Sequence, residues 1–273
     1  MAYKGALMVD DETLFRTMEV AAETGALVMV HAENGDAIDV LVKQALAGGH
    51  TEPHYHALTR PPETEGEATN RAIQLARVAG SPLYVVHVSC AGGGRADRTR
   101  AREGLGRLGR DAARSTSSST TRSSSGPTSR ARSTSTRRRR ATRTNQEVLW
   151  NAVRTDILSR DLDRPLRVPL GRPEDARHAT TSRRSRTAGP GLENRLQMIH
   201  EFGVRAGRIS LNRMVELLAT NPAKLFGLYP RKGTIAVGSD ADIVVFDPEK
   251  QVTISAATHH SKVGLQPLRG NRR

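Results

Sequence analysis

Residues 92–144 constrain the fold more than any other part of this 273-residue sequence. The segment contains 15 Arg and 3 acidic residues, and its only large apolar residues are Leu105 and Leu108. Such a composition cannot bury enough apolar surface to offset the conformational entropy of folding. Residues 160–186, with 8 Arg and 4 acidic residues, have a similar bias. We therefore expect both segments to be irregular, although long structureless insertions are uncommon inside compact domains.

The positive charge of the chain is confined to three segments. The formal net charge is +14, to which residues 92–144, 160–186 and 264–273 contribute +12, +4 and +3, so the rest of the chain carries −5. A basic total normally favours a polyanionic partner. However, residues 113–143 contain no aromatic side chain on which bases could stack. Nucleic-acid binding by this Arg/Ser-rich tract is therefore the weaker hypothesis.

The cysteine content and the hydropathy indicate the cellular compartment. Cys90 is the only cysteine, which excludes a disulfide framework and fits a reducing environment. The sequence has no signal-peptide pattern and no apolar run long enough to span a bilayer. These features predict a cytoplasmic protein without a membrane partner.

Helices and strands alternate in the first 91 residues. Residues 10–25 and 65–80 have apolar residues at helical spacing and end at glycine. Residues 26–34 and 81–90 contain short apolar runs that end in polar residues, as buried strands do. Helix, strand, helix, strand at this spacing predicts an α/β fold with a parallel sheet or barrel.

Two further blocks have an ordinary globular composition. A short one covers residues 145–155, and the other covers residues 189–263. Helical spacing predicts helices over 191–204 and 210–228. Residues 233–248, "GTIAVGSDADIVVFDP", alternate and turn in the manner of antiparallel strands, so we expect a small sheet there.

Two histidines and one lysine carry the candidate chemistry. His31 and His87 each end an apolar strand, in "MVHAEN" and "VVHVSC". In a parallel barrel these ends form the active-site face, where imidazole is a good Zn²⁺ ligand. The alternative is a pair of hydrogen-bonded core histidines. Lys4, in "AYKG", is either a surface residue or a buried lysine whose lowered pKa permits a carbamate with CO₂.

Several longer motifs carry a resemblance to a known family. They are "MAYKGALMVDDETLF", "VHAENGD", "HALTRPPE", "VVHVSC", "GPGLENRLQMIHEFGV" and "NPAKLFGLYPRKGTIAVGSDADIVVFDP". In this order they closely resemble the dihydropyrimidinase/D-hydantoinase family of cyclic amidohydrolases. The resemblance implies a (β/α)8 TIM-type metal-dependent hydrolase barrel with a small β-sandwich, usually assembled as a homotetramer. This chain would then hold a partial barrel and a remnant of the sandwich, with sequence missing at both ends.

The resemblance also implies a reaction and a metal site. Family members open the ring of a cyclic amide or ureide, such as a dihydropyrimidine or a 5-substituted hydantoin, as in pyrimidine catabolism. By the family pattern Lys4 is a carbamylated ligand that bridges two Zn²⁺ ions, and His31 and His87 bind the second ion. Metal-activated hydroxide attacks the ring carbonyl, and an aspartate carries the proton to the leaving nitrogen.

Parts of the family pattern are absent. No His-x-His pair precedes Lys4, and residues 158–167 read "LSRDLDRPLR" where the family has a "STDHC"-type strand with the aspartate. The sequence "HYH" at residues 54–56 lies between Gly- and Pro-containing segments, and we interpret it as a loop. No carbonyl-polarising tyrosine follows the lysine between residues 4 and 10. We therefore expect this chain to fold poorly and to have negligible hydrolase activity.

A frameshift hypothesis accounts for the segments that depart from the pattern. With suitable codons, "ARSTSSSTTR" read out of register gives the strand-like sequence TQYLFVDYT, and "DLDRPL" gives ISTDH. The chain would then divide into a barrel fragment (1–91), an out-of-frame segment (92–144), a second barrel fragment (145–222, with 160–186 out of frame) and a sandwich fragment (223–273). Resequencing the DNA tests this, because an unbroken frame would refute it. The alternative to an enzyme is a metal-free, non-catalytic scaffold protein of the same lineage.

Overall fold

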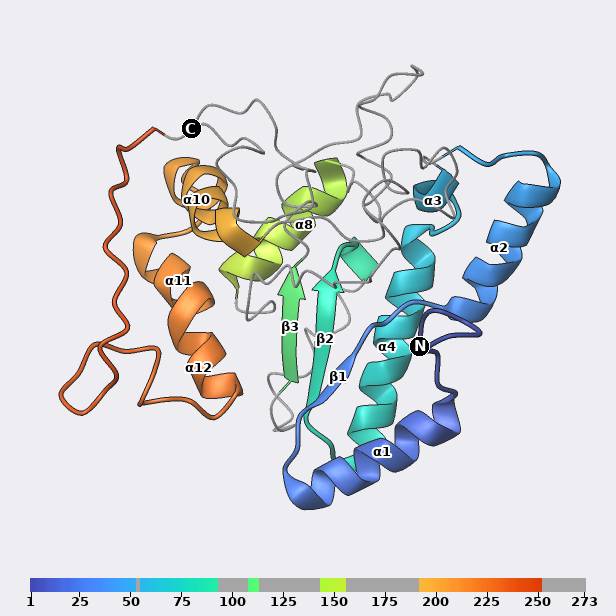
Figure 1. Cartoon of the computed structure of the whole chain (residues 1–273), viewed down its shortest axis with the longest axis horizontal. Helices are drawn as coiled ribbons and strands as arrows, with labels where there is room; N and C mark the ends of the chain where they lie inside the picture. Colours follow the sequence, from blue (N-terminus) through green and yellow to red (C-terminus); the bar gives the residue numbers. More distant parts are fainter. Residues whose placement is uncertain (53–54, 93–107, 113–142, 156–191, 252–273) are drawn as a thin grey trace, which may run out of the picture.

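A parallel three-stranded sheet forms the middle of the molecule (Figure 1). The computed structural model describes residues 1–52, 55–92, 108–112, 143–155 and 192–251. The strands are β1 (Val28–Val30), β2 (Leu83–Val88) and β3 (Leu108–Ala112), in that spatial order. Both pairings are parallel, so the carboxyl ends of the strands lie at one edge of the sheet. The predicted parallel α/β arrangement is confirmed for this part of the chain.

The two helices predicted in the first block are present and end at the expected glycines, although the second begins three residues before its predicted start. Helix α1 (Asp11–Thr24) begins after the N-cap Asp10 and ends at Gly25, whose φ is 71°. Helix α4 (Pro62–Ala79) has proline in its first turn and ends at Gly80, whose φ is 68°. Both glycines adopt the left-handed conformation that commonly terminates a helix and that costs other residues energy.

Two other helices of this block were not predicted. Helix α2 (Gly35–Ala47) begins where the Asn34 side chain accepts a hydrogen bond from the backbone N–H of Ala37. Helix α3 (Tyr55–Leu58) is a single turn. It overturns the loop interpretation of "HYH" at its second and third residues, because side-chain and backbone hydrogen bonds to the Tyr55 carbonyl close a helical turn there. The first histidine of that motif lies outside the described residues.

The helices predicted in the C-terminal half are also present. Residues 192–205 and 211–225 are helical. Each of these runs combines α-helical turns with 3₁₀ or π-helical turns. Ser210 caps the second run by accepting a hydrogen bond from the backbone N–H of Arg213. The elements are η1 (Leu192–Asn194), α10 (Arg195–Ile199), η2 (His200–Arg205), α11 (Leu211–Val215), η3 (Glu216–Thr220) and α12 (Asn221–Leu225).

The prediction that all of residues 92–144 are irregular is wrong in two places. Strand β3 lies inside this segment and pairs with β2, with Leu108 opposite Leu83. Helix α8 (Arg143–Arg154) begins before residue 145. Strand pairing uses backbone groups that every non-proline residue carries, so the poor apolar content of the segment did not exclude it. Residues 93–107, 113–142 and 156–191 lie outside the described part, and so does most of the predicted irregular sequence.

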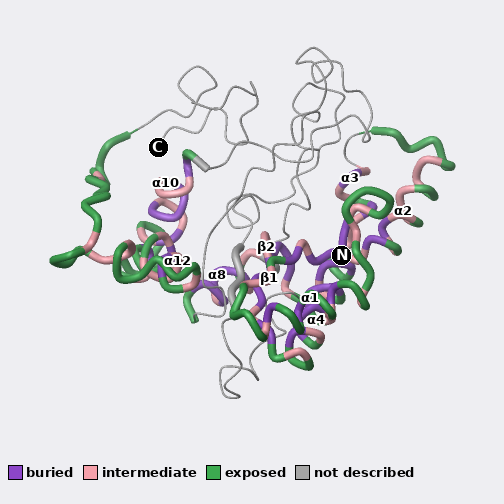
Figure 2. Tube along the Cα trace, turned by 60° about the horizontal axis from the view of Figure 1, so that its bottom comes forward, coloured by how far each residue is buried: buried purple, intermediate pink, exposed green. Residues whose placement is uncertain are grey.

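One hydrophobic core joins the coherent blocks of the sequence. Met18, Ile73 and Leu149 are fully buried, and they come from α1, α4 and α8. Leu217, from the C-terminal helices, belongs to the same cluster. Figure 1 places α1 and α4 on one side of the sheet and α8 with α10–α12 on the other, and Figure 2 shows buried residues along the helices on both sides. Among the described helices none has the length and apolarity that crossing a membrane requires.

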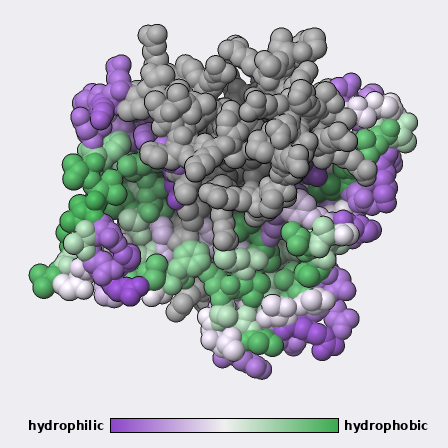
Figure 3. Space-filling view, in the orientation of Figure 1, coloured by the Kyte–Doolittle hydropathy of each residue, from purple (hydrophilic) through white to green (hydrophobic). Residues whose placement is uncertain are grey.

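The antiparallel strands expected over residues 233–248 are not formed. The described backbone there consists of turns and extended chain, and no strand among the described residues pairs with it. The apolar side chains are consequently exposed: Ile235 is 85% exposed and Val245 is 96% exposed. Figure 3 shows apolar residues gathered along the left side of the molecule, where this segment runs. Alternating residues favour a strand only where a neighbouring strand supplies hydrogen bonds.

Candidate functional site

His31 and His87 lie side by side at the carboxyl edge of the sheet. Their ring centroids are 4.3 Å apart, and the ring planes cross at 79°. His31 directly follows β1, and His87 lies near the end of β2, which pairs with β1. Parallel strands therefore bring together two residues that are 56 positions apart in the sequence. The expectation that both histidines lie at neighbouring strand ends agrees with this geometry.

The backbone of β2 is distorted at His87. Its φ is 47°, and the register of the pairing with β3 shifts between Val85 and Val88. A bulge of this kind re-aims a side chain at the end of a strand. A non-glycine residue in the left-handed region costs on the order of 1–3 kcal/mol and persists where its surroundings hold it. His87 is therefore held in an orientation that an undistorted strand would not give it.

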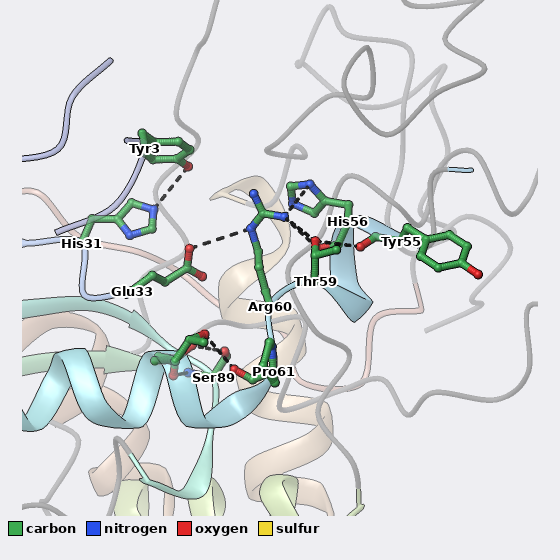
Figure 4. A network of polar contacts seen from close by, with 11 residues as sticks. Tyr3, His31, Glu33, Tyr55, His56, Thr59, Arg60, Pro61 and Ser89 are labelled. Atoms are coloured by element: carbon green, nitrogen blue, oxygen red, sulfur yellow. Dashed lines mark hydrogen bonds and ion pairs between the residues drawn. The ribbon is translucent and has the colours of Figure 1, made fainter. Parts of the chain in front are cut away.

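Tyr3 is the third aromatic residue of this group. Its hydroxyl oxygen lies 3.2 Å from Nε2 of His31, and the two rings meet edge to face with centroids 4.9 Å apart (Figure 4). The φ of Tyr3 is 63°, also in the left-handed region. The family pattern has a tyrosine after the lysine. In this chain a tyrosine directly precedes Lys4 instead. No signal in the sequence marks this positive φ, because tyrosine has no preference for it.

Lys4 has a different environment from the two histidines. Its Nζ lies 2.6 Å from Oδ1 of Asp36, and about half of its side chain is exposed. The hydrogen bond to Asp36 and the negative charge of that carboxylate raise the pKa of the Lys4 ammonium above its ordinary 10.5. In the described arrangement Lys4 is thus a partly exposed lysine with a raised pKa, which is the surface alternative of the two interpretations. A carbamate forms on a neutral amine, and Asp36 favours the charged one.

A buried polar cluster lies beside the histidines (Figure 4). Arg60 Nη1 donates to the carbonyl of His56 at 2.9 Å and lies 3.2 Å from its Nδ1. Arg60 Nε lies 4.0 Å from Oε2 of Glu33, whose residue is 2% exposed. A buried carboxylate is stable only with such partners. Sequence reasoning missed this cluster, although Glu33 follows His31 by two positions.

A second buried carboxylate, Glu65, contacts the end of β2. Glu65 is 3% exposed. Its Oε1 accepts hydrogen bonds from the backbone N–H groups of Ser89 at 2.6 Å and Cys90 at 2.9 Å, and its Oε2 accepts one from the hydroxyl of Ser89. Glutamate is rarely this buried without a specific role. The sequence signal was present but weak: a glutamate on the apolar face of a predicted helix.

The two imidazoles are compatible with a metal ion, but they do not complete a site. Within the described ranges, no group of three His, Cys, Asp or Glu residues is arranged to hold a metal. A third ligand would have to be Lys4, after release from Asp36, or a residue outside those ranges. The described geometry thus brings together two of the three predicted ligands, and the third, Lys4, pairs with Asp36 instead.

Comparison with known proteins identifies the class. Residues 182–268 match the sequence profile of the Amidohydrolase family. The crystal structure of a dihydropyrimidinase from Brevibacillus agri superposes with a TM-score of 0.90 at 45% identity, over 100% of this chain and 59% of that chain. A crystal structure of a D-hydantoinase superposes with a TM-score of 0.91 at 42% identity, over the same shares. By fold and sequence the chain is thus a homologue of amidohydrolases.

Proteins related in sequence indicate which kind of amidohydrolase the chain resembles. A D-hydantoinase of Geobacillus stearothermophilus is 45% identical over 276 residues, covering 99% of this chain and 57% of the relative. A dihydropyrimidinase of Rattus norvegicus is 36% identical, covering 99% of this chain and 52% of the relative. The resemblance to the dihydropyrimidinase/D-hydantoinase family is therefore confirmed. The chain spans a little over half the length of these relatives.

Proposed function

We propose that this chain carries part of the site of a cyclic amidohydrolase, which hydrolyses an amide bond in the ring of a dihydropyrimidine or a hydantoin. The relatives are named D-hydantoinase and dihydropyrimidinase, which supports this substrate class. The observation that carries the proposal is the contact between the rings of His31 and His87, 4.3 Å apart at the edge where parallel α/β folds place their active sites.

In this proposal His31 and His87 would hold a zinc ion, and Lys4, as a carbamate, would be a further ligand of the metal centre. When bound, zinc supplies a Lewis acid and hydroxide near neutral pH. Tyr3 orients His31 through the contact between its hydroxyl and Nε2. Lys4 must leave Asp36 before it can react with CO₂, so metal binding would compete with the ion pair that the structure shows.

The proposal also covers the partial (β/α)8 barrel, the remnant β-sandwich, the four-part division of the chain, the homotetramer and the cytoplasmic location. The relatives described above are hydantoinases and dihydropyrimidinases, so they give no support to a scaffold or a nucleic-acid-binding role. The described residues likewise provide no observation that favours either alternative.

A ring-opening assay with zinc tests the proposal. The purified chain is incubated with dihydrouracil or hydantoin, the N-carbamoyl product is measured, and the Geobacillus relative serves as the positive control. The sequence lacks the family's aspartate motif over residues 158–167, and a missing general acid–base costs roughly 10²–10⁴-fold in rate. We expect turnover to be negligible beside that of the relative, lower by at least this factor, and any residual turnover to depend on zinc. Turnover at the relative's rate would contradict the loss of rate that we assign to the missing aspartate. Turnover unaffected by chelators would contradict the metal site.

A further inference from the structure

Glu65 connects the start of α4 to the end of β2. The glutamate lies in the first turn of α4, where the helix dipole favours a negative charge. Its carboxylate accepts hydrogen bonds from the backbone N–H groups of Ser89 and Cys90 and from the Ser89 hydroxyl. These two residues follow Val88, the last residue of β2. Their N–H groups therefore bond to a carboxylate instead of to a neighbouring strand.

The glycines beside this connection fit the same close approach. A Cβ on Gly66 would lie 3.4 Å from the Cα of Gly92, and a Cβ on Gly92 would lie 3.2 Å from the Cα of Gly66. The start of α4 and the chain after β2 thus touch backbone to backbone. Two independent features, the buried carboxylate and the paired glycines, fix the position of this chain segment.

His87 depends on that segment for its orientation. It lies two positions before Ser89, in the bulge, with a φ of 47° that an unconstrained histidine rarely adopts. Strained conformations persist where neighbouring contacts fix the backbone. Downstream of His87, the hydrogen bonds to Glu65 hold the backbone at Ser89 and Cys90, next to the pairing of Val88 with β3.

We propose that Glu65 is a positioning residue, which holds the bulged end of β2 so that the His87 ring lies against the His31 ring. The consequence for metal binding rests on the proposed function, but the positioning itself does not. Glu63, in the same helical turn, is exposed and provides a matched control.

Nuclear magnetic resonance of the metal-free full chain tests the proposal. Histidine-labelled protein should show a nuclear Overhauser effect between the imidazoles of His31 and His87, with assignments from the single H31A and H87A variants. We expect E65A to abolish this effect and to shift the His87 signals, whereas E63A leaves both unchanged. E65Q should retain the effect, because its amide oxygen can accept from both backbone N–H groups and its NH₂ can donate to the Ser89 hydroxyl.

Two results would overturn the proposal. One is a folded E65A variant whose His31–His87 effect and His87 signals match those of the unsubstituted chain. If E65A does not fold, amide exchange in the unsubstituted chain decides: protection of the Ser89 and Cys90 N–H groups supports the connection, and exchange as fast as that of exposed amides overturns it. A chain that binds no zinc but shows the Glu65-dependent effect would refute the proposed function and leave this inference standing.

Discussion

At the scale of single residues, one hydrogen bond sets the start of α1. Asp10 Oδ1 accepts from the backbone N–H of Thr13 at 2.8 Å, and hydrogen bonding from the Thr13 side chain and backbone holds the pKa of the Asp10 carboxyl below its ordinary 3.8. A carboxyl whose pKa is lower in the folded state than in the unfolded state stabilises the fold above its unfolded pKa. That stabilisation is lost as the pH falls through the folded pKa.

We therefore expect the effect of the D10A substitution to depend on pH. The midpoint of thermal unfolding should be lower in D10A than in the unsubstituted chain at neutral pH, because the cap is lost. This difference should shrink as the pH falls below about 3.8, where the carboxyl of the unfolded chain takes up a proton first, and it should be smallest below the lower pKa of the folded state. Circular dichroism melting curves between neutral and strongly acidic pH measure it. D10N, which caps without a charge, is the control, and a difference that is constant with pH would contradict the expectation.

Residue identity in the site was predictable only in part. The positions of His31 and His87 follow from apolar runs that end in histidine, because parallel strands share their carboxyl edge. The contact of Tyr3 with His31 and the distortion at His87 depend on positive φ values that no local pattern indicates. The pairing of Lys4 with Asp36 depends on how the chain after β1 turns into α2, which is also non-local.

At the scale of elements, local signals were sufficient for the helices and insufficient for some strands. Capping residues, terminal glycines and apolar spacing all lie within one helix, so α1 and α4 could be predicted from the sequence. A strand also needs a partner. Residues 233–248 have a strand-like pattern but no partner within the described chain, whereas β3 has a poor pattern and pairs with β2.

The packing of α4 against the core gives an element-scale prediction. Ile73 is fully buried on this helix, and Val78, on the opposite side, is 76% exposed. Truncation of a buried isoleucine to alanine costs about 2–5 kcal/mol, whereas surface substitutions usually change stability by less than ~0.5 kcal/mol. We expect urea unfolding to show a loss in this range for I73A and almost none for V78A. Equal losses would mean that α4 does not pack as described.

At the scale of the whole molecule, the chain is similar in sequence to its relatives but spans only part of their length. The chain aligns almost completely with the D-hydantoinase of Geobacillus stearothermophilus, but it covers 57% of that protein. Most of its Arg-rich sequence lies outside the described residues, while the described parts share one core. The basic charge that first suggests a polyanionic partner thus belongs mostly to sequence segments outside the described residues.

The most direct measurement of the central claim, that His31 and His87 bind one metal ion together, is zinc K-edge X-ray absorption. Spectra are recorded on the zinc-loaded chain, on H31A and H87A, and on H50A, which removes a histidine stacked on Tyr55 away from the site. We predict nitrogen scatterers at about 2.0–2.1 Å with imidazole features. These features should weaken equally in H31A and H87A and persist in H50A. Spectra of H31A and H87A that are identical to that of the unsubstituted chain would contradict the claim.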